Sequence, residues 1–373
     1  MKLLAPNVGW AMNLGRLMWT SNGGTEWEDI TPPAAKGGLI SDVFFLDTSR
    51  GWVVLVHHGE PDIPGGLQFD LASTGDAGAT WTVEPLKMAD WLSSGSPSGG
   101  GASLAFADQS HGWLALYGGL DATSQGYGSV LATSDGGKSW EDTPGTPDSV
   151  AGPIVMVTPQ FGWLVGGGGA NDELYVTRDG AKTWQTVELE SPVKTDLMRE
   201  YDRNAEQFDR SFYQKLPPAA LKFAAKEPQH RFYAAYDLPT FQDPKHGHVC
   251  VTYPGVVVLF ATNDGGVTWK PDRVLAGMHG RQTGWKAASA VADSTWITGS
   301  IPKHGMPQLR RLGPEDHSET DTAGLEDFEI TRMSFATASQ GWVVTNYLKL
   351  LATNDGGATW TDITPGWPQP ATP

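Results

Sequence analysis

Residues Thr133 to Trp140 read TSDGGKSW, and this pattern of threonine, aspartate, paired small residues and tryptophan returns along the whole chain. We call the eight-residue pattern the box. The other copies are Thr20 to Trp27 (TSNGGTEW), Thr74 to Trp81 (TGDAGATW), Thr177 to Trp184 (TRDGAKTW), Thr262 to Trp269 (TNDGGVTW) and Thr353 to Trp360 (TNDGGATW). Self-similarity at a fixed period is typical of a fold built from repeated units.

A second landmark, Gly-Trp followed by apolar residues, precedes most boxes. It occurs at Gly9-Trp10, Gly51-Trp52, Gly112-Trp113, Gly162-Trp163 and Gly341-Trp342. Together the two landmarks define a unit of about 40 to 50 residues, the length of one propeller blade. Two units depart from the pattern: His248 replaces the first tryptophan of the fifth unit, and the unit at Ala287 to Thr320 lacks a box.

Each unit contains four short runs of strand-forming residues, with Asp-Gly turn signals between apolar segments. Four-stranded units of this length indicate a β-propeller. We therefore predict a single all-β domain, a seven-bladed propeller of four-stranded antiparallel blades, with a helical insertion at 191–231 between blades 4 and 5. The expected blades are 2–33, 38–86, 101–145, 152–190, 232–275, 286–320 and 327–365.

The box residues are expected to be structural. An aspartate or asparagine accepts backbone N–H groups within a tight turn, glycine adopts its positive φ, and tryptophan packs below it. Six equivalent turns around a ring cannot converge on one substrate. The residues assigned to this role are Asn22, Asp76, Asp135, Asp179, Asp264, Asp355, Trp27, Trp81, Trp140, Trp184, Trp269 and Trp360.

The charge and cysteine content of the chain exclude some classes of binding partner and site. Lys and Arg number 26 and Asp and Glu 42, so the formal charge is −16, which opposes binding to nucleic acid. The single cysteine, Cys250, excludes an internal disulfide, and no apolar run is long enough to span a bilayer. We expect a monomer without metal or cofactor. We also expect an extracytoplasmic location with the signal sequence removed, and a cytoplasmic location stays open because the N-terminus resembles no signal peptide.

Loop lengths indicate where binding occurs. The second turn of a blade and the link to the next blade vary in length, and both emerge on one face of a propeller. The candidate binding residues in these segments are His57, His58, Glu60, Trp91, Tyr117 and Tyr127. The alternative is that these loops are tolerated excursions without a function.

The insertion differs in pattern from the blades. Leu197, Tyr201, Phe208 and Phe212 lie at helical spacing, and Thr195 is a candidate N-cap. We predict a helix over 196–215 that acts as a lid and presents positive charge to an anionic ligand or partner. Its candidate binding residues are Arg199, Tyr201, Arg203 and Arg210. A helix that only packs on the ring is the competing interpretation.

The box resembles the Asp-box (BNR) repeat of the sialidase superfamily, sortilin-type receptors and xyloglucan-active hydrolases. Gly341-Trp-Val-Val344 with Leu351-Ala-Thr-Asn-Asp-Gly-Gly-Ala-Thr-Trp360 looks most like propellers of the photosystem II stability/assembly-factor type. This resemblance implies a commonly exported binding or assembly platform. The sequence departs from sialidases, because its first unit offers only Arg16 and lacks their early Phe-Arg-Ile-Pro-like segment.

The resulting functional prediction is a propeller that binds a protein or a glycan on its insertion-bearing face. The alternative is a carbohydrate-active enzyme that uses the same face. A glycoside hydrolase would need paired carboxylates from Glu60, Asp62, Asp90, Asp121 or Asp196, and a polysaccharide lyase would use a set such as His58, Tyr127, Tyr201 and Arg203. The sequence alone leaves open whether the protein is catalytic.

Overall fold

The computed structural model describes residues 1–35, 39–58, 67–86, 101–120, 126–147, 150–168, 171–200, 202–203, 234–276, 287–291, 294–300, 307–312, 319–321, 325 and 330–366. Nearly all regular structure in these ranges is β-strand, and the described strands form seven sheets. A short 3₁₀ helix, η1 (Pro33–Ala35), follows the first sheet. Residues 196–200 are α-helical.

Strand bounds in the N-terminal half are as follows. The first sheet has β1 (Lys2–Ala5), β2 (Val8–Asn13), β3 (Arg16–Thr20) and β4 (Glu28–Asp29). The second has β5 (Leu39–Phe45), β6 (Gly51–His58), β7 (Leu67–Thr74) and β8 (Thr82–Pro85). The third has β9 (Gly101–Phe106), β10 (Gly112–Leu120), β11 (Gly126–Thr133) and β12 (Glu141–Asp142). The fourth has β13 (Val150–Met156), β14 (Gly162–Gly168), β15 (Asn171–Thr177) and β16 (Gln185–Val187).

The C-terminal half continues the series. The fifth sheet has β17 (Ala235–Tyr236), β18 (Thr240–Phe241), β19 (Gly247–Tyr253), β20 (Val256–Thr262) and β21 (Lys270–Ala276). The sixth has β22 (Ala287–Val291), β23 (Ser294–Ser300), β24 (Pro307–Leu312) and β25 (Glu319–Asp321). The seventh has β26 (Ile330–Phe335), β27 (Gly341–Thr345), β28 (Leu350–Thr353) and β29 (Thr361–Asp362).

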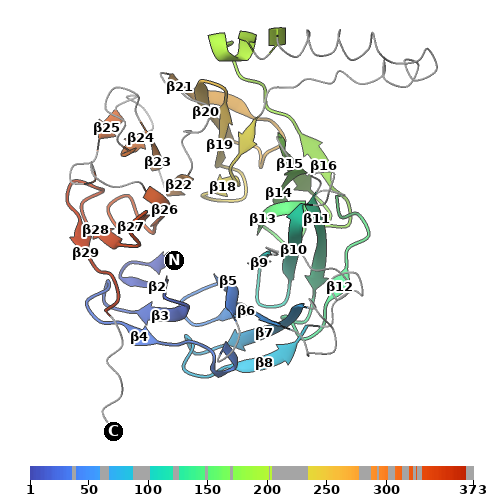
Figure 1. The fold of residues 1–373 in the computed structure, drawn as a ribbon, viewed down its shortest axis with the longest axis vertical. Helices are drawn as coiled ribbons and strands as arrows, with labels where there is room; N and C mark the ends of the chain where they lie inside the picture. Colours follow the sequence, from blue (N-terminus) through green and yellow to red (C-terminus); the bar gives the residue numbers. More distant parts are fainter. Residues whose placement is uncertain are drawn as a thin grey trace.

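Each sheet is antiparallel, and in every sheet but the fifth the strands follow one another as a simple meander. Figure 1 shows these sheets arranged around a ring, with the first strand of each sheet innermost and the last one outermost. This arrangement is a β-propeller, and each sheet is one blade. We number the blades 1 to 7 in chain order.

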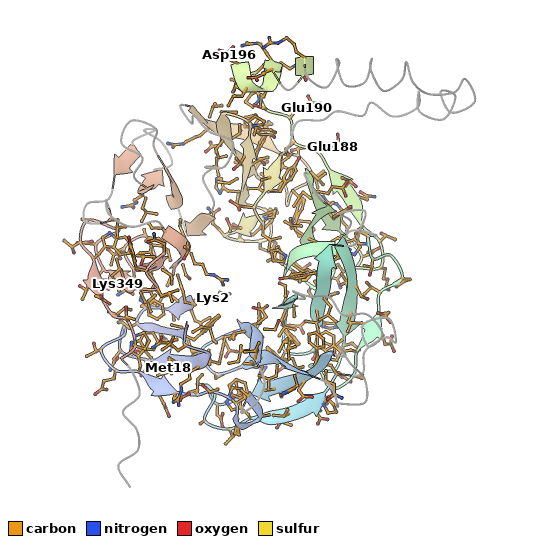
Figure 2. The ribbon with its side chains drawn as sticks, in the orientation of Figure 1. Lys2, Met18, Glu188, Glu190, Asp196 and Lys349 are labelled. Atoms are coloured by element: carbon orange, nitrogen blue, oxygen red, sulfur yellow. The ribbon has the colours of Figure 1, made fainter. Side chains whose placement is uncertain are left out.

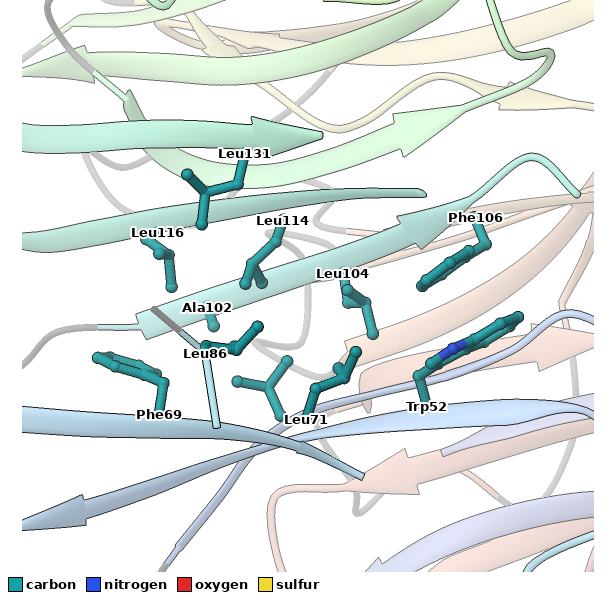
Figure 3. Close-up of a cluster of buried hydrophobic side chains, with 11 residues drawn as sticks. Trp52, Phe69, Leu71, Leu86, Ala102, Leu104, Phe106, Leu114, Leu116 and Leu131 are labelled. Atoms are coloured by element: carbon teal, nitrogen blue, oxygen red, sulfur yellow. The ribbon is translucent and has the colours of Figure 1, made fainter. Parts of the chain in front are cut away.

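The core lies between neighbouring blades. In the cluster between blades 2 and 3, Trp52 stacks on Phe106 with ring centroids 3.6 Å apart (Figure 3). Leu71, Leu104 and Leu114 fill the same interface. Comparable clusters join blades 1 to 2, 3 to 4 and 4 to 5. Each blade therefore buries its two faces only by packing against its neighbours.

The ring closes by side-chain contacts between blades 7 and 1. Leu3, Ala11 and Trp342 belong to one buried cluster that spans this junction. The backbone N–H of Leu3 donates to Ser334 Oγ at 3.1 Å, and Trp27 Nε1 donates to the carbonyl of Ile363 at 2.9 Å. Among the described strands, no strand of blade 7 is hydrogen-bonded into the sheet of blade 1. We call this junction the seam.

The predicted fold class was wrong in two respects. The blades are not uniformly four-stranded, because β17 and β18 share the inner position of blade 5 and both pair with β19. Pro239 lies between them and cannot donate a ladder hydrogen bond, which fits the break. The predicted helical insertion is also not a major part of the described fold. The described helix is limited to 196–200 and 202–203, and the rest of 196–215 lies outside the described residues.

Candidate functional site

The two faces of the ring differ in which turns they carry. The box turn joins the third and fourth strands of a blade, and its glycine N–H bonds to the turn between the first and second strands. Gly136 N–H, for example, donates to the carbonyl of Ser110 at 2.9 Å. We call this the box face. The second turn of each blade and the links between blades emerge on the opposite face, which we call the insertion face.

A cavity of about 370 Å³ opens among residues from blades 1, 2 and 7 at their insertion-face ends. Its wall combines apolar side chains of blades 1 and 7 with two opposite charges on inner strands, Asp42 of β5 and Arg332 of β26. The apolar part includes Trp10, Met12, Leu14 and Leu348. This cavity, which we call the mouth site, is the candidate functional site.

Two leucines at the mouth site have an unusual backbone. Leu14 lies in the β2–β3 turn with φ of 51°, and Leu348 lies in the β27–β28 turn with φ of 59°. A bulky residue at positive φ is strained, and such outliers cluster at binding and switch sites. Both side chains are also largely exposed, at 62% and 74%. The chain thus holds two apolar groups in water on strained turns of adjacent blades.

Further exposed apolar side chains belong to residues that line the cavity or are next to them in sequence. Leu39 at the start of β5 and Tyr347 beside Leu348 are exposed to 70% and 68%. The side chain of Met12 is also partly exposed, at 37%. Apolar side chains gathered around one opening mark interaction sites more often than scattered ones do.

Asp42 is positioned by a β-bulge. The register of β5 against β6 shifts between Ile40 and Asp42, and bulges re-aim the side chains beside them. Its carboxylate accepts the backbone N–H of Leu104 in blade 3 at 2.7 Å and its own neighbour's, Val43, at 2.8 Å. Burial raises the pKa of Asp42 to about 6, although these N–H groups and Arg332 act to lower it.

Other charged and polar groups share this environment. The register of β26 shifts between Ile330 and Arg332, as β5 does at Asp42. Lys2 lies on the inner side of the ring (Figure 2), with Nζ 5.3 Å from the Phe44 ring centroid. Burial lowers the pKa of Lys2 while Asp42 raises it. Burial, and then the charge of Asp42, raises the pKa of Tyr117.

Of the six binding residues predicted in the variable loops, four belong to strands and two lie outside the described residues. His57 lies near the end of β6 and pairs with Asp70 of β7, with Nε2 to Oδ2 at 2.9 Å. Tyr117 of β10 is half-buried and electrostatically coupled to Asp42 and Arg332. His58 and Tyr127 belong to strands β6 and β11, but their side chains lie outside the description. Glu60 and Trp91 lie outside the described residues.

The start of the insertion docks on blade 5. Thr195 Oγ1 accepts the N–H of Met198 at 3.1 Å, which caps the short helix, and donates to the carbonyl of Pro254 at 2.6 Å. Met198 is buried in the cluster between blades 4 and 5. Arg199 is exposed and pairs with Asp196 at 2.6 Å, as expected of a local surface pair.

Of the other insertion residues, Arg203 is exposed. Tyr201 and Arg210 lie outside the described residues. The candidate catalytic sets that include Asp62, Asp90, Asp121 or Tyr201 fall there too. The lid therefore stays a prediction.

The box residues form a repeated turn on the box face. In blade 3, Asp135 Oδ1 accepts the N–H of Ser139, and Thr133 Oγ1 accepts the N–H of Gly137, both at 3.0 Å. Gly137 has φ of 94°, which only glycine adopts without strain. The hydroxyl and the N–H of Thr268 are the main causes that lower the pKa of Asp264 to about 2, and Thr359 does the same for Asp355. Asn22, Asp76 and Asp179 occupy the same position in their blades.

The sequence analysis did not select Asp42 and Arg332 because both lie on inner strands and outside the variable loops. A signal was present: both residues stand nine positions before the Gly-Trp landmark of their blade, at Gly51 and Gly341. Ser103 occupies the equivalent position of blade 3, where its Oγ accepts the N–H of Ile154 at 3.2 Å. In blade 3 the residue nine positions before Gly-Trp is a serine that bonds to the next blade. A charged residue at the same position in blades 2 and 7 could therefore have identified the mouth site.

Within the described ranges, no three His, Cys, Asp or Glu side chains are grouped so that they could hold a metal ion. In the same ranges, no helix has the length and apolar character required to traverse a bilayer.

Comparisons with known proteins show the fold alone. No family model matches the sequence, and no curated protein does. Among solved structures, YCF48 from Cyanidioschyzon merolae is 16% identical, with 87% of this chain and 85% of that chain covered and a TM-score of 0.50. A structure of YCF48 bound to a D1 peptide is 17% identical over 87% of this chain and 82% of that one, with a TM-score of 0.49.

An ulvan lyase of polysaccharide lyase family PL25 is similarly distant. It is 11% identical, with 97% of this chain and 86% of that chain covered and a TM-score of 0.51. Similarity to both YCF48 from Cyanidioschyzon merolae and the lyase places the chain among the propellers without selecting an activity.

Proposed function

We propose that this protein is a binding propeller whose insertion face engages a segment of a partner protein at the mouth site. The observation that carries the proposal is the pair Leu14 and Leu348, each exposed and each on a strained turn beside the same cavity. Strained backbone and exposed apolar area both cost free energy, and a partner that buries the leucines offsets that cost.

The charges at the mouth site favour a peptide that carries an acidic group. Arg332 is exposed, and a guanidinium binds a carboxylate through two parallel N–H bonds. Lys2 adds a second cation nearby, whereas Asp42 already accepts two backbone N–H groups. An apolar side chain between the two leucines with a carboxylate toward Arg332 therefore fits this surface best. YCF48, a distant structural neighbour, has been solved with a D1 peptide.

A displayed peptide library selected on the immobilised protein tests the proposal. We expect enrichment of sequences in which a large apolar residue lies close to an acidic one, and loss of their binding to a Leu14→Gly/Leu348→Gly variant. Val267→Ser is the matched control, because Val267 is exposed to 65% but lies in a box turn on the opposite face. Peptides that bind the double variant as well as the wild type would contradict the proposal.

The enzymatic alternative rests on one observation. His57 Nε2 lies 2.9 Å from Asp70 Oδ2 toward the insertion-face end of blade 2, although the two atoms are not aligned as a hydrogen bond. A histidine beside a carboxylate is a candidate general base. Incubation with plant, algal and bacterial polysaccharides, followed by assays for new reducing ends and for ultraviolet absorbance of unsaturated ends, distinguishes the two functions. Product formation that disappears in a folded His57→Gln variant would favour the enzyme, and its absence across the panel would favour the binding protein.

A further inference from the structure

A second cavity, of about 580 Å³, lies on the box face of blade 5, away from the mouth site. Its wall includes His246 and Asp243 from the first turn of the blade, His248 of β19, Ala261 of β20 and Lys270 of β21. We call it the blade 5 pocket. Its volume falls in the range of small-molecule sites.

The pocket occupies a place that tryptophan fills in other blades. In blades 2 and 3, the tryptophan of the Gly-Trp landmark reaches the box of the next blade, where Trp52 Nε1 donates to Gly136 and Trp113 Nε1 to Gly180, each at 3.0 Å. Trp163 of blade 4 packs so tightly on the next box that a Cβ built at Gly266 would lie 2.4 Å from its ring. These tryptophans leave no room for another molecule.

At blade 5 the sequence lacks both partners of this contact, the landmark tryptophan of the blade and the box of the next blade. His248 stands where the landmark tryptophan stands in other blades, and its cross-strand row continues through Ala261 to Lys270. The corresponding row in blade 3 is Trp113, Ala132 and Glu141. On the other side, residues 313–318 between β24 and β25 contain neither the paired glycines nor the tryptophan of a box. The blade 5 pocket lies where the ring of the landmark tryptophan is absent.

Polar groups in the pocket define what could bind. The Nδ1 atom of His248 is buried and has no hydrogen-bond partner among the described residues. Burial lowers the pKa of His248, with Asp272 acting against this shift and Arg273 adding to it. Asp243 is already engaged by His246 Nδ1 at 2.7 Å and by the N–H of Lys245 at 2.8 Å. Lys270 is exposed and supplies positive charge at the end of the row.

We propose that the blade 5 pocket binds a flat aromatic ring that carries a carboxylate, with the ring in the space of the absent tryptophan. The ring would lie against Ala261 and the His248 imidazole, and the carboxylate would pair with Lys270. The space left by the missing tryptophan ring can admit a flat ring of similar shape, which is the physical basis of the first contact. This site is independent of the mouth site.

Titration calorimetry with indole-3-acetate and tryptamine tests the proposal, since the two probes share the indole ring and differ in charge. We expect indole-3-acetate to bind the wild-type protein at least tenfold more tightly than tryptamine. Lys270→Gln should weaken indole-3-acetate binding by a similar factor, and His248→Trp should abolish it because the new ring fills the pocket. Lys138→Gln, an exposed lysine in the box of blade 3, is the matched control.

Three results would overturn the proposal. They are absence of indole-3-acetate binding by the wild type, binding that survives both His248→Trp and Lys270→Gln, and equal affinity for the two probes. Lys270→Gln alters only an exposed side chain, so the test remains decisive if His248→Trp does not fold. Peptide binding at the mouth site should be unchanged in Lys270→Gln, which separates failure of this proposal from failure of the proposed function.

Discussion

Trp27 and Ile363 are 336 residues apart in sequence, and the indole Nε1 of the first donates to the carbonyl of the second at 2.9 Å. The same contact joins blades 1 and 2, where Trp81 Nε1 donates to the carbonyl of Ile30 at 2.8 Å. In both places an isoleucine follows an aspartate and precedes Thr-Pro, as in Asp362-Ile363-Thr364-Pro365. The seam therefore uses the box contact of an ordinary blade junction.

Trp27→Phe tests this equivalence. The variant keeps most of the ring and removes the N–H, so the free energy of unfolding should fall by about 1 kcal/mol. Trp81→Phe is the matched control and should lose a similar amount, because the contact is the same although the two partners are closer in sequence. Urea unfolding followed by circular dichroism measures both. A loss at Trp81 with none at Trp27 would show that the seam is not held by this contact.

The pKa of Asp42 should depend on Arg332. The pKa is raised to about 6 by burial, and the Arg332 guanidinium acts to lower it. Arg332→Gln removes a charge that stabilises the carboxylate, so the pKa should rise further. Carbon-13 NMR of the carboxyl group over pH 4 to 8 measures the change. An unchanged or lower pKa in the variant would mean that the two charges do not share the mouth site.

The raised pKa of Asp42 also has a consequence for stability. Its value in the folded state exceeds the unfolded value of 3.8, so the folded protein binds the proton more tightly. The stabilisation from this proton is present below about pH 4 and is lost as pH rises through about 6. The contribution of Asp42 therefore favours slightly acidic conditions.

The box aspartates have the opposite dependence. Asp264 and Asp355 have pKa values of about 2, below the usual 3.8, because threonine hydroxyl and backbone N–H groups bond to the carboxylates. Their stabilisation is present above about pH 4 and is lost as pH falls through about 2. Replacement of both by asparagine, the residue present at Asn22, should lower the melting temperature at pH 7 and flatten its decline between pH 4 and 2. Parallel pH profiles for variant and wild type would count against this role.

Leu348→Gly should separate stability from binding. Glycine adopts a φ of 59° freely, which relieves about 1 kcal/mol of strain, and its greater freedom in the unfolded chain costs a similar amount. We expect the free energy of unfolding to change by less than about 1 kcal/mol, while affinity for a selected peptide falls at least tenfold. Chemical denaturation and peptide titration report the two effects. A large loss of stability would assign Leu348 to the fold instead of the mouth site.

A propeller could be predicted from the sequence because the box turns and the Gly-Trp landmarks fix the strand order within each blade. The double inner strand of blade 5 was not foreseen, since the break at Pro239 is a local departure inside a repeat. The mouth site was missed because Asp42 and Arg332 lie on inner strands, away from the variable loops, and the bulges beside them cannot be read from a single sequence. His57 was selected for its loop, but its partner Asp70 is set by strand pairing, which sequence spacing alone did not indicate.

The seam has a mechanical consequence. Blades 7 and 1 are not joined by a chain link, so the ring can part there without stretching any covalent connection, whereas every other junction is tethered. The mouth site draws its wall from both of these blades. A partner bound there would bridge the one untethered junction and act as a clasp, so binding should slow the opening of the ring and lengthen the lifetime of the folded protein.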